Sequence, residues 1–246
     1  MDVHTVPTNF VFPPEERPGD LAAPLFKDIP VIDLRQVGAH DQADLLQQIM
    51  KGSQDFGMFQ VINHGVSEEL MDDSMSLFKE FFDMPTGEKA TYYSEDKSKT
   101  FWVYTGSFNH IKGNVNYWKD CETKLSPYRG SLPILERLLG HSVEVKKLSL
   151  RILDLICEGL GVEVGYFADE LSKIQGLVAN HYPSCPNPSL VLGLGGHCDP
   201  NLLTILQQVY GLQIFKDEQW VSVEPPAHAF VINTANQLEI ITIIHL

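Results

Sequence analysis

The chain has 246 residues, of which 43% are hydrophobic and 20% charged, a composition typical of a globular protein with a large core. Its 32 acidic residues outnumber 18 basic ones, and the formal net charge is −14. This excess argues against a nucleic-acid or anionic-membrane partner, because both require a basic surface.

Residues 1–28 form a leader that is rich in proline and acid and is expected to lie on the surface or to be partly disordered. No apolar run has the length of a signal peptide core or a membrane span, so we expect a cytoplasmic protein with reduced thiols. The cysteines form no CxxC pair, which argues against a structural zinc site of the usual spacing. They are Cys121, Cys157, Cys185 and Cys198.

Helices and strands alternate in the predicted N-terminal half. Short apolar runs predict strands at 29–34 and 58–65, and apolar residues at helical spacing predict a helix at 41–57. A second helix is predicted at 67–85, because Ser67 can cap its start. Residues 86–132 lack a clear period and predict loops or irregular β structure.

A long amphipathic helix is predicted at 142–161, where the two glycines near its end favour termination. Its apolar stripe consists of Val145, Leu148, Ile152, Leu155 and Ile156. From Gly176 onward, short apolar runs are separated by turn residues and predict strands. These runs are 176–183, 190–199, 202–208, 212–223, 229–233 and 238–244. The chain is therefore expected to be α+β, with a C-terminal jelly roll.

One short motif contains residues that are suited to binding a metal ion. In "GGHCDPNLLTILQQ", His197 and Asp199 are two residues apart and would share one face of a strand. An imidazole and a carboxylate suit iron(II) or manganese better than structural zinc. A pattern of two residues is also compatible with a buried histidine and a carboxylate that hold a turn. Cys198 is expected on the opposite face, in the core.

Together with "NHYPSCPNP", this motif resembles the plant 2-oxoglutarate- and iron(II)-dependent dioxygenases, in particular alkaloid hydroxylases similar to hyoscyamine 6-dioxygenase. The likeness extends from about Ile29 to Thr242 and includes "IPVIDL", "DFGMFQVINHGV", "YWKDC" and "GLQIFKDEQWVSVEP" in the family's order. It implies a double-stranded β-helix (jelly-roll) core preceded by a mixed helical and strand region.

The resemblance also implies iron(II) held by two histidines and one carboxylate, with 2-oxoglutarate as co-substrate and ascorbate as reductant. His197 and Asp199 match the first two ligands, and Asn180 and Tyr182 match positions near 2-oxoglutarate. The implied partner is a small plant specialised metabolite, with hydroxylation or another oxidation as the reaction.

The sequence departs from the family near its C-terminus. The resemblance places the third ligand, a histidine followed by arginine, beyond Leu246, together with the Arg-x-Ser pair that clamps 2-oxoglutarate. His245 in "IIHL" is a poor match for that ligand, and "NTAN" (233–236) departs from the family's glycine-containing motif. We therefore expect a C-terminally truncated jelly roll with unpaired edges, poorly folded or inactive.

The expected organisation has four segments: a leader at 1–28, an N-terminal dioxygenase region at 29–133, connecting helices at 134–175 and a partial jelly-roll domain at 176–246. Three functional interpretations remain open. The first is an active dioxygenase, the second a catalytically inactive remnant or isoform, and the third a metal-binding protein of cupin type without oxygen chemistry.

Overall fold

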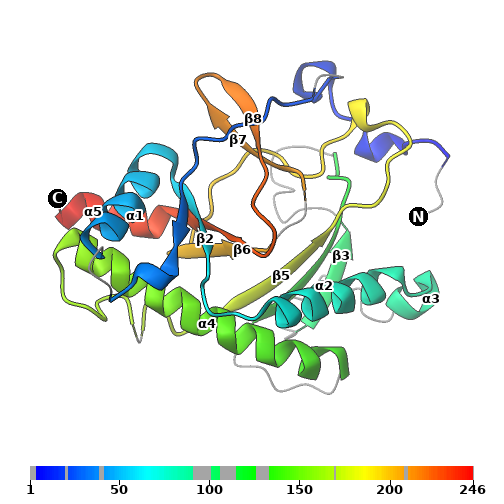
Figure 1. Cartoon of the computed structure of the whole chain (residues 1–246). Coiled ribbons are helices and arrows are strands. Elements are labelled where there is room, and N and C mark those ends of the chain that lie inside the picture. Colours follow the sequence, from blue (N-terminus) through cyan, green and yellow to red (C-terminus); the bar gives the residue numbers. More distant parts are fainter. Residues whose placement is uncertain are drawn as a thin grey trace. The chain divides into compact units, whose positions relative to one another are not determined.

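The structure is a computed structural model that describes residues 4–19, 22–38, 42–90, 101–105, 115–125, 133–168, 170–207 and 210–245 (Figure 1). Its helices are α1 (Gln42–Phe56), α2 (Glu68–Asp83), α3 (Thr86–Lys89), α4 (Pro133–Leu160) and α5 (Asn236–His245). Its strands are β1 (Val31–Asp33), β2 (Met58–Ile62), β3 (Phe101–Thr105), β4 (Asp120–Leu125), β5 (Gly176–His181), β6 (Leu203–Leu206), β7 (Leu212–Lys216), β8 (Gln219–Val223) and β9 (Phe230–Thr234). Within these described ranges, no helix combines the length and the apolar character that crossing a membrane requires.

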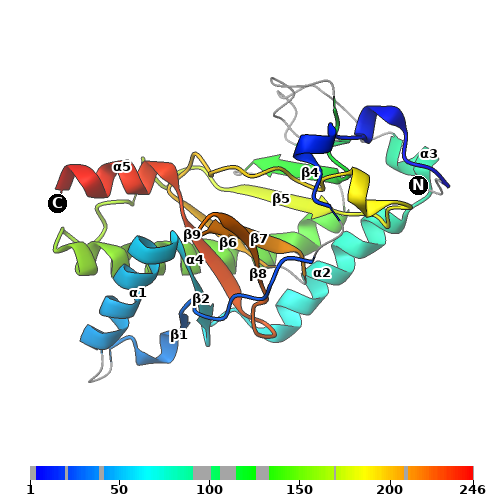
Figure 2. The same cartoon turned by 90° about the horizontal axis from the view of Figure 1, so that it is seen from above.

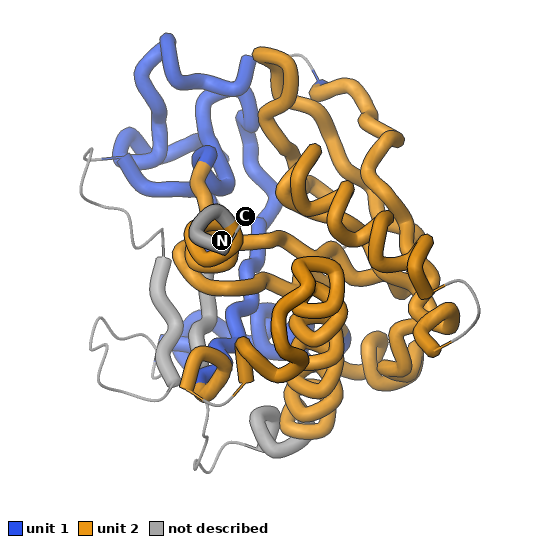
Figure 3. Tube along the Cα trace, turned by 90° about the vertical axis from the view of Figure 1, so that its left-hand side faces the viewer, with its two compact units in different colours: residues 1–22, 76–131, 174–196 blue, residues 23–75, 132–173, 197–246 orange. Residues whose placement is uncertain are grey.

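The chain divides into two compact units, which are considered separately (Figure 3). The first unit contains residues 1–22, 76–131 and 174–196. The second contains residues 23–75, 132–173 and 197–246. Both units are built from separate stretches of the chain, and the four consecutive segments expected from the sequence stay a prediction.

A four-stranded sheet forms the centre of the second unit. Its strand order is β1-β2-β9-β6, with β1 parallel to β2 and the other pairs antiparallel. Helices α1 and α4 pack against it (Figure 1), because both present apolar stripes that must be removed from water. The core includes Phe59, Phe230 and Ile232 from the sheet and Ile152 from α4, all at most 1% exposed.

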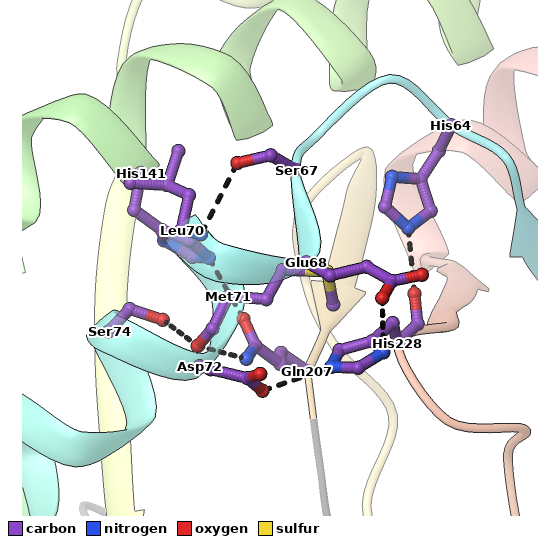
Figure 4. A network of polar contacts seen from close by, with 10 residues as sticks. All are labelled: His64, Ser67, Glu68, Leu70, Met71, Asp72, Ser74, His141, Gln207 and His228. Atoms are coloured by element: carbon purple, nitrogen blue, oxygen red, sulfur yellow. Dashed lines mark hydrogen bonds and ion pairs between the residues drawn. The ribbon is translucent and has the colours of Figure 1, made fainter.

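Two histidines in the second unit connect the first turns of α2 to the sheet (Figure 4). His64 Nε2 donates to the carbonyl oxygen of His228 at 2.8 Å, and its Nδ1 accepts the amide of Val66 at 3.2 Å. The His228 ring lies 3.0 Å from Asp72 Oδ1 and 3.5 Å from Glu68 Oε2. His64 therefore has a partner for each ring nitrogen.

His141 on α4 continues this network (Figure 4). Its Nε2 lies 2.9 Å from Gln207 Oε1, and Gln207 Nε2 donates to the carbonyl of Met71 at 2.9 Å. Because the Gln207 amide nitrogen is used in this way, His141 must donate from Nε2. Its Nδ1 is a buried acceptor that has no hydrogen-bond partner among the described residues.

The first unit contains the antiparallel sheet β3-β4-β5. Along β5 the side chains alternate between exposed and half-buried positions, as a strand with one covered face requires. His181 lies on the covered face and stacks on Phe82 of α2 with ring centroids 4.7 Å apart. Asn180 and Tyr182 are exposed, so His181 faces away from them.

The helices and strands predicted in the N-terminal half and the long helix predicted at 142–161 are confirmed. They correspond to β1, α1, β2, α2 and α4. The apolar stripe of α4 is also confirmed, since four of its five residues are at most 3% exposed and Val145 packs on the same core. The hairpin β7–β8 replaces the single run predicted at 212–223. It turns at Asp217 and Glu218, whose φ angles of 49° and 63° belong to a two-residue hairpin turn.

Three expectations are wrong. Residues 190–199 form no strand, because no neighbouring strand pairs with this glycine-rich segment in the described part of the chain. The side chain of Cys198 is exposed rather than in the core. The run 238–244 belongs to helix α5, which continues from β9 (Figure 2) and packs Leu238 and Ile241 against the core.

The helical conformation of α5 leads to a prediction. In a strand Leu238 and Ile240 would share a face, whereas in the helix Leu238 is 2% exposed and Ile240 is 58% exposed. We expect Leu238→Ala to lower the free energy of unfolding by about 2–4 kcal/mol and Ile240→Ala to change it by less than about 0.5 kcal/mol. Urea unfolding measures both, and equal losses would contradict the helix.

The burial of His64 and His141 predicts that the free energy of unfolding falls at acidic pH. Burial lowers the pKa of His64 and of His141 below the usual 6.5. The unfolded chain therefore gains protons that the folded protein does not as the pH falls below about 6.5. Each histidine should then lower the free energy of unfolding by up to about 1.4 kcal/mol per pH unit until its folded-state pKa is reached.

Urea unfolding between pH 7.5 and 5 checks this expectation. His64→Gln and His141→Gln should each reduce the pH dependence, while His4→Gln, which changes an exposed side chain, serves as the matched control. A pH dependence that is the same in all four proteins would show that neither buried ring resists protonation.

Candidate functional site

His197 and Asp199 are neighbours in the second unit. His197 Nε2 lies 3.5 Å from Asp199 Oδ1, and the two side chains are 44% and 24% exposed. They are carried by a segment without regular secondary structure between the 3₁₀ turn Pro188–Leu190 and β6, not by a strand as expected. The structure therefore brings the two predicted ligands together, and both side chains are partly exposed.

Backbone hydrogen bonds fix the segment that carries Asp199. The amide of Asn236 donates to the carbonyl of Asp199 at 3.0 Å, and the amide of Gln237 donates to Asn201 at 3.1 Å. The amide of Ala235 donates to Leu202, also at 3.1 Å. The first amides of α5, which have no partner inside the helix, thus find acceptors in residues 199–202 and hold Asp199 in place.

The Asp199 carboxylate lies among three side-chain donors. A hydrogen bond from His197 lowers the pKa of Asp199, and Thr204 and Asn233 act in the same direction, whereas burial raises it. Thr204 on β6 and Asn233 on β9 are directly opposite each other in the sheet. The pairing of these two strands therefore supplies the surroundings that favour the ionised carboxylate, which is the form that binds metals.

The donor set fits part of an iron site. Two donors bound to one ion at right angles lie about 3 Å apart when each bond is about 2.1 Å long, which is close to the 3.5 Å between His197 Nε2 and Asp199 Oδ1. Over the residues that the structure describes, no three His, Cys, Asp or Glu side chains converge as a metal would require. His245 ends α5, and its side chain lies outside the described part.

Asn180 and Tyr182, the residues predicted near 2-oxoglutarate, belong to the first unit. Asn180 Oδ1 accepts a hydrogen bond from Lys119 Nζ at 3.0 Å. The Tyr182 side chain is 50% exposed, and its ring lies against Gly193, where an added Cβ would approach ring atom Cδ1 to 2.8 Å. Asn180 lies on the exposed face of β5, and Tyr182, the residue that follows the strand, is exposed as well.

A shallow cavity of about 150 Å³ occurs elsewhere in the second unit. Its lining comes from the turn after β2 and from α4, and it includes neither His197 nor Asp199. The basic residue Lys147 there is already paired with Glu144 at 2.7 Å. This cavity therefore adds nothing to the candidate metal ligands.

Three polar residues that act on predicted site residues within the same unit were not themselves predicted. Lys119 lies in "YWKDC" and Asn233 in "NTAN", which were compared only with the family pattern, and Thr204 lies in an apolar run. Because lysine side chains are rarely buried, the sequence carries no signal for the burial of Lys119. Nothing in the sequence indicates that Thr204 and Asn233 face each other.

Comparisons with known proteins identify the family of the chain. Residues 29–128 match the family model of the non-haem dioxygenase in morphine synthesis N-terminal region, and residues 173–243 match that of the 2OG-Fe(II) oxygenase superfamily. The chain is 42% identical over 259 residues to hyoscyamine 6-dioxygenase of Hyoscyamus niger, with 97% of this chain and 74% of that protein covered. It is 36% identical over 249 residues to flavanone 3-dioxygenase 2 of Oryza sativa subsp. japonica, with 96% and 71% covered.

A solved structure supports the same relationship. The crystal structure of JOX2 in complex with 2OG, Fe, and JA superposes with a TM-score of 0.80 and 32% sequence identity, and the alignment covers 98% of this chain and 72% of that one. Its fold is that of the 2OG-Fe(II) oxygenases, the double-stranded β-helix, which confirms the predicted fold class. On these matches, the chain belongs to the plant 2-oxoglutarate- and iron(II)-dependent dioxygenases.

Proposed function

We propose that this chain oxidises a small, alkaloid-like plant metabolite as an Fe(II)/2-oxoglutarate-dependent dioxygenase. In this proposal His197 and Asp199 hold the iron, and Asn180 and Tyr182 contact 2-oxoglutarate. The observation that carries it is the imidazole and carboxylate pair, 3.5 Å apart on a segment that backbone hydrogen bonds hold in place. A mixed pair of this kind is typical of non-haem iron(II) oxygenases.

The residues of the chain have separate roles. Asp199 binds as the anion, because its neighbouring donors favour the ionised form. His197 binds through a neutral imidazole nitrogen, and the exposure of both side chains leaves room for co-substrate and dioxygen. When bound, the iron supplies oxidation of a substrate C–H bond coupled to decarboxylation of 2-oxoglutarate to succinate, with ascorbate as reductant.

The exposed surface around β5 is compatible with the binding of a small organic substrate. Val178 lies on the same exposed face of β5 as Asn180, and Val178 and the following Tyr182 are 51% and 50% exposed. The formal net charge of −14 favours the approach of a cation such as a protonated amine. Both features are compatible with an alkaloid, the substrate class that the name of hyoscyamine 6-dioxygenase indicates for that relative.

A second candidate function is a catalytically inactive form of such an enzyme. The observation that favours it is that the described residues bring together two metal donors and no third. With two donors, iron binding would be weak, and turnover would not follow. Iron binding by the chain itself therefore separates the two candidates.

Our first prediction for the site concerns iron binding. Anaerobic addition of iron(II) and 2-oxoglutarate to the chain should produce a saturable metal-to-ligand charge-transfer band. His197→Ala and Asp199→Ala should each abolish the band, because each removes one of the few metal donors. Cys198→Ser changes the exposed residue between them and should leave the band unchanged.

Turnover is measured on the same proteins with hyoscyamine as substrate and succinate as the recorded product. A band with turnover supports the active enzyme, and no band in a protein that unfolds cooperatively supports the inactive form. Unchanged iron binding in His197→Ala would refute the assignment of the ligands.

The second prediction concerns Tyr182. Tyr182→Phe keeps the ring against Gly193 and removes only the hydroxyl group. We expect the affinity for 2-oxoglutarate to fall about tenfold, as for the loss of one hydrogen bond to a carboxylate, with iron affinity unchanged. Titration of the charge-transfer band gives both affinities, and Tyr210→Phe, at an exposed tyrosine of the other unit, is the control.

A further inference from the structure

The segment 117–119 is hydrogen-bonded to Asn180 and to Pro183, the residue after Tyr182, all within the first unit. Trp118 is 4% exposed, and its indole Nε1 donates to the carbonyl of Pro183 at 2.9 Å. Its backbone amide donates to Leu192 at 2.8 Å. The same short segment is thus attached both to the chain that follows Tyr182 and to the glycine-rich stretch 192–195.

Tyr117 adds further contacts that hold segment 117–119 in place. Its ring stacks on Phe12 with centroids 5.5 Å apart, and its hydroxyl occupies the space that a Cβ at Gly195 would need. Residue 195 can therefore be only glycine as long as the tyrosine stays in place. Segment 117–119 is consequently held from several sides, which fixes the position of its last residue, Lys119.

Lys119 is 6% exposed, although lysine side chains are rarely buried to this extent. Its Nζ donates to Asn180 Oδ1 at 3.0 Å. The pairing of β4 with β5 brings the two residues close, since Cys121 is opposite Asn180 in the register. A buried ammonium group at this place is costly to desolvate, so its retention favours a polar role over simple packing.

The contact determines the orientation of the Asn180 amide. A lysine ammonium group can only donate hydrogen bonds, so the atom of Asn180 that faces it must be the carbonyl oxygen. The amide nitrogen of Asn180 then points away from Lys119. Because Asn180 is exposed, this nitrogen is presented to ligands as a pure donor.

From this geometry we infer that Lys119 is a positioning residue: it holds Asn180 with its Nδ2 donor directed at an oxygen acceptor of a bound 2-oxo acid. The inference rests on the proposed function, because it assumes that Asn180 contacts the co-substrate. Lys119 itself is buried and acts through Asn180. Without Lys119, the Asn180 amide could rotate by about 180° and present its oxygen to the anionic ligand. The partial negative charge of this oxygen would repel the anion.

The orientation of Asn180 can be tested without any ligand. The side-chain ¹⁵N–¹H₂ signals of Asn180 are assigned by their loss in Asn180→Asp. Lys119→Met keeps the length of the side chain but removes the donor, and it should shift these signals while other side-chain amides stay in place. Lys119→Arg keeps a cationic donor and should return the signals close to their original positions, and Lys216→Met is the control for losing a lysine elsewhere in the chain.

The role in ligand binding is tested by anaerobic titration with iron(II) and 2-oxoglutarate. Lys119→Met should lower the affinity for 2-oxoglutarate about tenfold and leave the affinity for iron unchanged. Lys119→Arg should recover most of the lost affinity. Asn180→Asp should cost a similar factor, and the double variant should cost no more than either single one, because both changes remove the same oriented donor.

The outcomes separate the two proposals. If the unaltered chain does not bind 2-oxoglutarate, the proposed function fails, and the ligand role of Lys119 fails with it. If it binds and the Asn180 signals or the affinity are unchanged in Lys119→Met, only the role of Lys119 is overturned. Should Lys119→Met not fold, Lys119→Gln replaces it, and additive losses with Asn180→Asp would likewise refute the inference.

Discussion

The position of Asp199 and the surroundings of its carboxylate depend on the antiparallel pairing of β6 with β9. This pairing sets Thr204 opposite Asn233, and both side chains act together with His197 on the Asp199 carboxylate. It also places the end of β9 so that the first amides of α5 reach the carbonyl groups of residues 199–202. The candidate ligand is therefore positioned by two consecutive elements at the C-terminal end of the chain, and a change in register by one residue would move Thr204 and Asn233 to the other face.

The sequence predicted the elements whose apolar pattern was strong. The stripe of α4 and the apolar run of β2 could be recognised because burial alone determines their pattern. The run at 238–244 was misjudged because β-branched isoleucines favour strands, whereas tertiary packing of Leu238 and the hydrogen bonds at the start of α5 favour the helix. Intrinsic preference is a weak guide where packing opposes it.

The candidate site was predictable only in part, for the same physical reason. His197 and Asp199 are close in sequence, so a local motif was sufficient to connect them. Thr204 and Asn233 meet only through the sheet, and Lys119 reaches Asn180 across 61 positions of the chain. Such contacts depend on strand register, which a single sequence does not reveal, and the burial of Lys119 contradicts the usual exposure of lysine.

The exposed thiol of Cys198 has a practical consequence. Of the cysteines whose side chains are described, Cys157 is buried and Cys185 is half-buried, whereas Cys198 is exposed between the two proposed ligands. Alkylating reagents react with accessible thiolates, so this position should be labelled before Cys157, whose pKa is raised by burial. The protein thus contains a natural attachment point for a fluorescent or paramagnetic reporter directly beside the place where iron would bind.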